Sequence, residues 1–337
     1  MGMIHPFDLG DFFLVYRMQK LGVWLDPYLS TLGSELPVLA ALSAPFRWRG
    51  GDLMTYVSRS GRSGGGIIQM QLRSNRPEAH ILFVAPALGD DERAADLWRR
   101  LLAHCVQRAG GEQVQRLFTH VPEEAQDMLS QFVQTGFVPY TREEMYCLEK
   151  PRELPNTLGS YRIRPLTPED GWALQRLYTA ITPRLVRQAE GTDGGWPDAQ
   201  QPARLSATRW ERFVLVRDGE VAGLILVLPG RSGHCLKLWG DFLEDGEVLA
   251  LLRRGLSSLA AHASRSVYCL VREYQSGVRL VLDDQGFRPM TAWSCLVKHT
   301  VVRAREPARR GWKALEPRAE PSVPGAMPTA VHDPSSR

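Results

Sequence analysis

Cysteine is scarce in this sequence and is not arranged for disulfide or metal chemistry. The five cysteines, at positions 105, 147, 235, 269 and 295, are scattered along 337 residues without a C-x-x-C pair. An odd, dispersed set is typical of reduced thiols in a cytoplasmic protein. His80 and His234 also lack a second ligand at metal spacing, so the sequence predicts no metal site.

Long apolar runs and a strong charge imbalance are also missing. No apolar run approaches the roughly 20 residues that a membrane-spanning helix needs. The first residues, MGMIHPFDLGDFF, lack the basic region and apolar stretch of a signal peptide. The net charge is only +4, from 41 basic and 37 acidic residues. We therefore expect a cytoplasmic protein with neither a nucleic-acid nor a membrane partner, and the oligomeric state stays open.

The chain contains an internal repeat. The segment at 80–102, HILFVAPALGDDERAADLWRRLL, aligns without gaps on 234–256, HCLKLWGDFLEDGEVLALLRRGL, and seven of the 23 positions are identical. Upstream, Ile4-His5-Pro6 matches Ile163-Arg164-Pro165, and downstream QTGFVPYT at 134–141 matches DQGFRPMT at 284–291. The matches are collinear, and a repeat this long indicates a duplicated domain. Two generic strand-helix-strand segments are the alternative.

The repeat and the length together predict the domain organisation. A chain of 337 residues corresponds to about two domains of roughly 150 residues. We expect an N-terminal domain at 1–150 and a C-terminal domain at 151–303. The segment 304–337 is rich in proline and charge and is predicted to be a disordered tail.

Hydrophobic periodicity and turn residues predict the order β-α-α-β-β-β-α-β-α-β. Gly136 and Gly286 are expected to end helices, because glycine favours the left-handed position there. In the first copy, strands are expected at 52–60, 67–74, 80–87, 114–121 and 143–149, and helices from residue 9 and at 28–43, 90–109 and 123–135. In the second copy, strands are expected at 161–166, on both sides of Asp218-Gly219, and at 235–242, 267–273 and 292–299, with helices at 168–182, 245–262 and 275–285 and a loop at 188–203.

This order, the GF-x-P sequence after the last helix of each copy, and Val84-x-Pro86 resemble the GNAT family of N-acetyltransferases, here in tandem. The resemblance implies an α/β (α+β) protein of two GNAT-like domains, each with a mixed, mostly antiparallel sheet flanked by helices. It also implies that a central strand separates from its neighbour. Acetyl-CoA would lie in that separation, with its pyrophosphate on the free amides at the start of the following helix.

The phosphate loop of the family, [QR]-x-x-G-x-[GA], is changed in both copies. The corresponding residues are Gly89-Asp90-Asp91-Glu92-Arg93-Ala94 in the first copy, where only Ala94 fits. In the second copy they are 243–248, where only Gly246 fits. The added carboxylates would repel a pyrophosphate. The resemblance assigns cofactor binding to Val84, Gly89, Asp90, Asp91, Arg93, Ala94 and Gly246. Because the first copy retains Val84-x-Pro86 and Ala94, it is the favoured donor site.

The catalytic tyrosine of many family members is absent, because Phe132 and Leu282 stand at its position. Glu123 and His120, at the end of a predicted strand, are the candidate general bases. Glutamate at a helix start is also ordinary dipole compensation, so Glu123 could have a structural role.

Two functions remain open from the sequence. The first is an acyl-CoA-dependent N-acetyltransferase acting on a small-molecule or protein amine. The alternative is a catalytically inactive GNAT-like scaffold that binds a ligand or partner. A fold alone does not decide between them.

Overall fold

The computed structural model describes residues 3–32, 37, 42, 52–60, 64–73, 76–89, 92–149, 161–191, 210–230, 232–259 and 265–300. The predicted disordered tail, 304–337, lies outside these residues, as does most of the predicted helix at 28–43 beyond residue 32. Within the described ranges, every helix is too short or too polar to cross a membrane.

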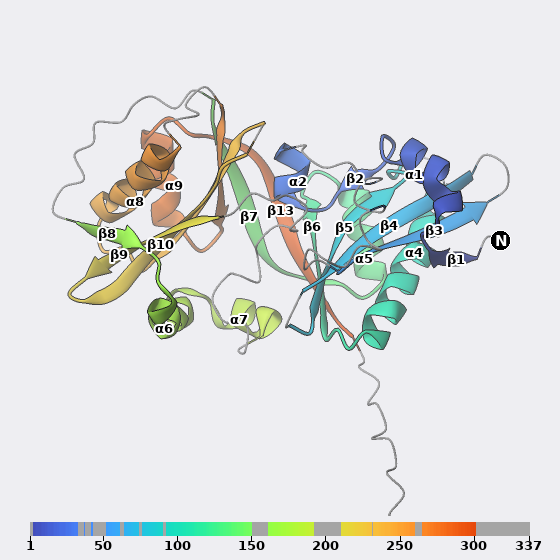
Figure 1. The fold of residues 1–337 in the computed structure, drawn as a ribbon, viewed down its shortest axis with the longest axis horizontal. Coiled ribbons are helices and arrows are strands. Elements are labelled where there is room, and N and C mark those ends of the chain that lie inside the picture. The colour runs from blue at the N-terminus through green and yellow to red at the C-terminus, as the bar shows by residue number, and fades with distance from the viewer. Residues whose placement is uncertain are drawn as a thin grey trace, which may run out of the picture. The chain divides into compact units, whose positions relative to one another are not determined.

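The first copy begins with short elements and continues with long strands and two helices (Figure 1). Its elements are β1 (Ile4–Pro6), η1 (Leu9–Asp11), α1 (Phe12–Met18), β2 (Val23–Trp24), α2 (Pro27–Leu32), β3 (Asp52–Ser60), β4 (Gly64–Leu72), β5 (Glu78–Ala85), α4 (Glu92–Gly111), β6 (Arg116–Pro122), α5 (Gln126–Gln134) and β7 (Val138–Leu148).

The second copy repeats this order, except that none of its described residues forms a strand corresponding to β2. Its elements are β8 (Arg162–Pro165), η3 (Pro168–Asp170), α6 (Gly171–Ile181), α7 (Arg184–Glu190), β9 (Glu211–Arg217), β10 (Glu220–Leu228), β11 (His234–Gly240), α8 (Asp245–Ser258), β12 (Val267–Arg272), α9 (Ser276–Asp284) and β13 (Arg288–His299). The α/β (α+β) class predicted from the sequence is confirmed.

The two copies exchange their last strands within one sheet. The strand order is β1-β3-β4-β5-β6-β13-β7-β12-β11-β10-β9-β8, so β13 of the second copy pairs with β6 of the first, and β7 of the first pairs with β12 of the second. Figure 1 shows β7 and β13 side by side at the middle of the sheet. Among these pairs only β5–β6 and β11–β12 are parallel, and the others are antiparallel.

The exchange follows the internal repeat residue by residue. Glu143 on β7 lies opposite Trp293 on β13, and these two are the equivalent positions of the two copies. The amide of Glu123 donates to Ala292 O at 2.9 Å, and the amide of Glu273 donates to Arg142 O at 3.0 Å. The donors of these two bonds occupy equivalent positions of the repeat, and so do the acceptors. A local two-fold relation, with its axis between β7 and β13, therefore connects the two copies.

Apolar residues on both faces of the sheet form the cores. Helices α8 and α9 pack on one face of the second copy, and α4 and α5 pack on the corresponding face of the first. The opposite face is covered by α1 in the first copy and α6 in the second. Two short helices cross between the copies: Tyr28 of α2 packs in the core of the second copy, and Ala189 of α7 packs on Phe118 of the first.

Turn and capping chemistry is confirmed where glycine was expected. Gly136 and Gly286 have φ of 84° and 85°, in the left-handed region, directly after α5 and α9. Asp218 and Gly219 also have positive φ and join β9 to β10. Two elements escape the sequence patterns: β2 is only two residues long, and α7 lies partly within the predicted loop at 188–203.

Candidate functional site

Strands β5 and β6 of the first copy separate, and the chain itself fills the separation. They pair only from Glu78 to His80 on β5. Beyond that point β2 pairs with β5, the amide of Leu25 donates to Leu82 O at 2.7 Å, and the amide of His120 on β6 donates to Leu25 O at 3.2 Å. Leu25 therefore occupies the Leu82 carbonyl and the His120 amide. An extended ligand bound between β5 and β6 would need these same backbone groups.

Strands β11 and β12 of the second copy separate in the same way. They pair from His234 to Lys237 on β11 and then diverge. The side chain of Gln275 bridges the strands, because its Nε2 donates to Leu238 O at 2.7 Å and its Oε1 accepts from the amide of Arg272 at 2.9 Å. No strand equivalent to β2 enters this separation among the described residues.

The start of α8 in the second copy is held by an internal carboxylate. Glu247 is buried, and its Oε2 accepts the amide of Leu243 at 2.9 Å. The same carboxylate accepts from Arg217 at 2.8 and 2.9 Å. Gly246 packs against the Tyr161 hydroxyl, which donates to Glu244. A negative group already satisfies this end of the helix.

The predicted cofactor residues of the first copy that the structure describes lie in different environments. Val84 is buried in β5 between β4 and β2. Gly89 is exposed with open space around its Cα, and Arg93 and Ala94 lie in the first turn of α4. Asp90 and Asp91 lie outside the described residues. Cofactor binding by any of these residues stays a prediction.

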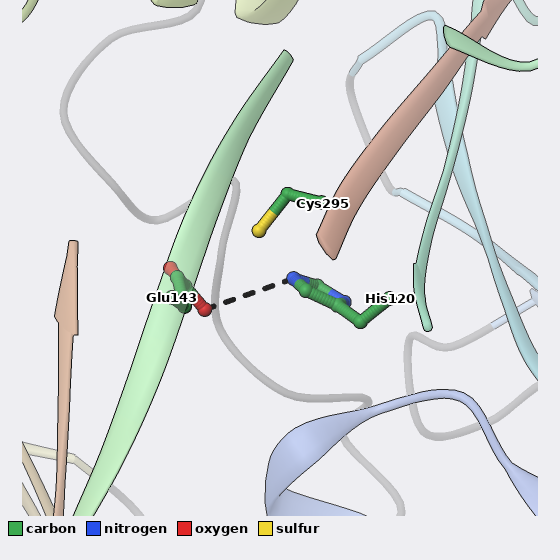
Figure 2. A group of neighbouring side chains, drawn as sticks. All are labelled: His120, Glu143 and Cys295. Carbon is green, nitrogen blue, oxygen red and sulfur yellow. Dashed lines mark ion pairs between the residues drawn. The ribbon is translucent and has the colours of Figure 1, made fainter. Parts of the chain in front are cut away.

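A cluster of buried charged and polar side chains lies where the two copies meet. Glu143 Oε1 accepts from Arg272 Nε at 2.6 Å and lies 3.5 Å from Lys237 Nζ, while its Oε2 lies 3.8 Å from His120 Nε2. Arg272 also pairs with Glu190 of α7 at 2.9 Å. We call these five residues, together with Cys295 beside Glu143, the central cluster. Figure 2 shows three of its members, His120, Glu143 and Cys295.

The electrostatics of the central cluster follow from its burial. Burial alone would raise the pKa of the Glu143 carboxyl. The positive charges of Lys237 and Arg272 outweigh burial and hold this pKa well below its ordinary value. Burial lowers the pKa of His120, against the opposing effect of Glu143, so its imidazole is neutral near pH 7. Burial, and then Glu143, raise the pKa of the Cys295 thiol well above its ordinary value.

Several buried polar atoms of this region lack a hydrogen-bond partner in the described part of the chain. They are Glu143 Oε2, Arg272 NH1, Tyr28 Oη and Trp293 Nε1. Buried polar atoms in native proteins are almost always satisfied by protein, water or a bound group. The described side chains alone therefore leave these four atoms unsatisfied.

The duplication supplies an internal comparison for the central cluster. On β5 of the first copy, the strand equivalent to that of Lys237, residues 81–85 are all apolar. The fold therefore forms around apolar residues at these places and does not require the charges. The equivalent positions of His120, Glu143, Arg272 and Cys295 are Leu270, Trp293, Pro122 and Met145.

The two predicted bases have separate partners. Glu123 accepts from Arg142 Nε at 2.6 Å, and both side chains are 36% exposed. His120 belongs to the central cluster and lies next to Glu143, which the sequence patterns did not reveal. The alternation of β7 alone could have placed Glu143 on the face of Thr141 and Met145, but not beside Arg272, because the strand exchange brings them together.

Comparison with known proteins shows the fold. No protein-family profile and no curated protein matches the chain. Among solved structures, a tandem GNAT protein from the clavulanic acid biosynthesis pathway has a TM-score of 0.54 at 18% identity, over 89% of this chain and 98% of its own. A GCN5-related N-acetyltransferase from Sphaerobacter thermophilus has a TM-score of 0.52 at 14% identity, over 88% of this chain and 95% of its own.

The chain has the tandem GNAT fold. In this tandem GNAT fold the β5–β6 and β11–β12 separations are the two places where the resemblance puts an acyl donor. One separation is filled by the chain. The other ends at Lys237 and Arg272 of the central cluster.

Proposed function

We propose that this protein is an acyl-CoA-dependent N-acetyltransferase of the GNAT type and that its second copy holds the acyl donor. The observation that carries the proposal is the difference between the two separations. The β5–β6 separation is closed by the backbone hydrogen bonds of Leu25, whereas no described strand enters the β11–β12 separation, where the side chain of Gln275 bridges Leu238 and Arg272. This proposal replaces the first copy, which the loop residues favoured, with the second.

The central cluster supports this assignment because it lies where β11 and β12 diverge. Acetyl-CoA would supply an activated acyl group there. An amine acceptor must lose a proton as its nitrogen bonds to the acyl carbon, and the bond from that carbon to sulfur breaks. His120 is the candidate to accept the proton, because it is neutral and partly exposed, at 17% of its side chain. Glu123 is a weaker candidate, since Arg142 holds its carboxylate.

A second candidate function is supported by Glu247. Its carboxylate takes the Leu243 amide and the Arg217 guanidinium, which are groups that a pyrophosphate would otherwise use at this helix start. A GNAT-like protein whose anion site is filled internally could act as a scaffold that binds a ligand or partner without catalysis.

Calorimetric titration with acetyl-CoA and with CoA tests both candidates. The parent is compared with Glu247→Gln in the second copy and with Glu92→Gln, at the start of α4 in the first. Tighter binding by Glu247→Gln alone is expected, since that change removes a negative charge from the anion site. Absence of binding by the parent at millimolar ligand would overturn the acetyltransferase. If only Glu92→Gln changed the affinity for acetyl-CoA or CoA, the donor site would be assigned to the first copy instead.

The reaction itself is tested by release of free CoA thiol in the presence of amines. The expected result is amine-dependent release that falls in His120→Asn and is retained in Glu123→Gln. Binding of CoA without release for any amine would favour the scaffold.

A further inference from the structure

Three side chains of different chemistry converge within the central cluster. His120 comes from β6, Glu143 from β7 and Cys295 from β13, and Figure 2 shows them pointing toward one another. A ring nitrogen, a carboxylate oxygen and the sulfur all lie within 4.8 Å of one another. The His120 Nε2 to Glu143 Oε2 distance is 3.8 Å.

These distances suit a shared metal ion. In a tetrahedral site with metal–ligand bonds of about 2.0 to 2.3 Å, ligand atoms lie roughly 3.3 to 3.8 Å apart. For a nitrogen and an oxygen, with bonds of about 2.0 to 2.2 Å, the spacing is roughly 3.3 to 3.5 Å, so the 3.8 Å between His120 Nε2 and Glu143 Oε2 must shorten by a few tenths of an ångström. The sulfur lies within 4.8 Å of both atoms and requires a shift of about 1 Å. Imidazole nitrogen, carboxylate oxygen and thiolate sulfur are the three ligand types that zinc uses in proteins.

We propose that His120, Glu143 and Cys295 form a binding site for one divalent metal ion of the zinc type. Three protein ligands leave one position of a tetrahedron open, as in catalytic zinc sites. The site is shared by the two copies, since β13 reaches the first copy only through the strand exchange. It does not rest on the proposed acetyl transfer, but the two roles compete at His120, because a ring nitrogen bound to a metal cannot accept the proton of an amine.

The surroundings hold the carboxylate in place for this role. Arg272 and Lys237 take Glu143 Oε1 and leave Oε2, which no described group hydrogen-bonds, directed toward His120. Hydrogen bonding of a ligand's second oxygen is the usual support for a metal-bound carboxylate.

The charge balance also permits a divalent ion. Two cations, Arg272 and Lys237, already offset two carboxylates, Glu143 and Glu190. On metal binding Cys295 loses its thiol proton to solvent, so the net gain of the buried site is one positive charge rather than two. Metal-ligand spacing along the sequence predicted no such site, because the three ligands come from separate strands.

The local two-fold relation shows that the ligands are not required by packing. The positions equivalent to His120, Glu143 and Cys295 carry Leu270, Trp293 and Met145. None of these side chains offers nitrogen, oxygen or thiolate as a metal ligand. The local two-fold relation therefore places three metal-ligand side chains at one position and none at the equivalent position.

Cobalt is the probe that tests this proposal. The full-length chain, freed of metal by chelation and dialysis, is titrated with Co²⁺ and then with Zn²⁺. One Co²⁺ per chain is expected to give the thiolate-to-cobalt charge-transfer absorption of a cysteine-bound site, and Zn²⁺ is expected to displace it. Absence of that absorption in the parent overturns the proposal.

Two variants locate the site. Cys295→Ser is expected to lose the absorption, whereas Cys235→Ser, whose thiol is equally buried at 1% exposure, is expected to keep it. Retention of the absorption in Cys295→Ser overturns the proposal. If circular dichroism shows that Cys295→Ser does not fold, His120→Asn takes its place. It is expected to weaken Co²⁺ binding more than the roughly 10- to 100-fold seen for outer-shell changes, and unchanged affinity overturns the proposal.

Discussion

Replacement of Glu143 by glutamine should destabilise the protein far more than the same change at Glu123. Each carboxylate accepts from an arginine Nε at 2.6 Å, so the two ion pairs match in bond length and chemistry. They differ in burial: Glu143 and Arg272 are 2% and 3% exposed, whereas Glu123 and Arg142 are both 36% exposed.

The magnitude follows from this difference. Glu143→Gln removes the carboxylate that lies against both Arg272 and Lys237 and leaves Arg272 with Glu190, and removal of one partner of a buried pair lowers the free energy of unfolding by about 3–5 kcal/mol. For Glu123→Gln the loss should be about 0–1 kcal/mol, because solvent screens both charges. Urea unfolding of the parent and the two variants, followed by circular dichroism, measures both values.

The pH dependence gives a second readout with a fixed sign. The pKa of Glu143 is lowered in the folded protein, so its contribution is present above the unfolded carboxyl value, about 4.3. That contribution decreases as the pH falls toward the folded value. The stability difference between the parent and Glu143→Gln should therefore shrink in acid. Equal losses for the two variants at neutral pH would refute the reasoning that burial sets the strength of the pair.

Three further results are expected. Gly22→Ala should lower the unfolding free energy by about 1–3 kcal/mol, because its Cβ would contact the Phe83 ring and lie 2.7 Å from Val84 O; the same urea titration measures it. Cys147, half-buried, should react first with a thiol reagent in the native protein, since the other four cysteines are buried, and mass spectrometry of digested peptides identifies it. Separately produced 1–150 and 151–303 should associate one to one when mixed, as size-exclusion chromatography with light scattering would show.

The sequence predicted the elements better than their pairing. Alternating apolar residues, the Asp218-Gly219 turn and the glycines after α5 and α9 are local signals, and the corresponding elements are present. The predicted start of the last strand at residue 143 was too late, because β7 begins at Val138. Residues 138–142 carry proline and charge, which the strand pattern disfavours, and pairing with β13 overrides that preference.

The site depended on contacts that no local pattern reports. His120 was a candidate base from its place at a strand end, but its nearest acidic partner is Glu143 rather than Glu123. The exchange of β7 and β13 brings Arg272 and Glu143 together across 129 positions of sequence. Closure of the first copy was equally hidden, because β2 is too short to give a periodic signal.

The charges of the central cluster also favour pairing between unlike copies. If 1–150 dimerised with itself through β7, Glu143 would stand opposite a second Glu143, because that position and 293 are equivalent. Like charges directly opposed across strands are destabilising, and here they would be buried without Arg272. A pair of second copies would instead bury Arg272 and Lys237 twice against Trp293, with no carboxylate from β7. A pair of second copies would keep Glu190 beside Arg272, but only the mixed pair brings Glu143 to Arg272 and Lys237, so a stable dimer of 1–150 alone would refute the view that this cluster selects the partner.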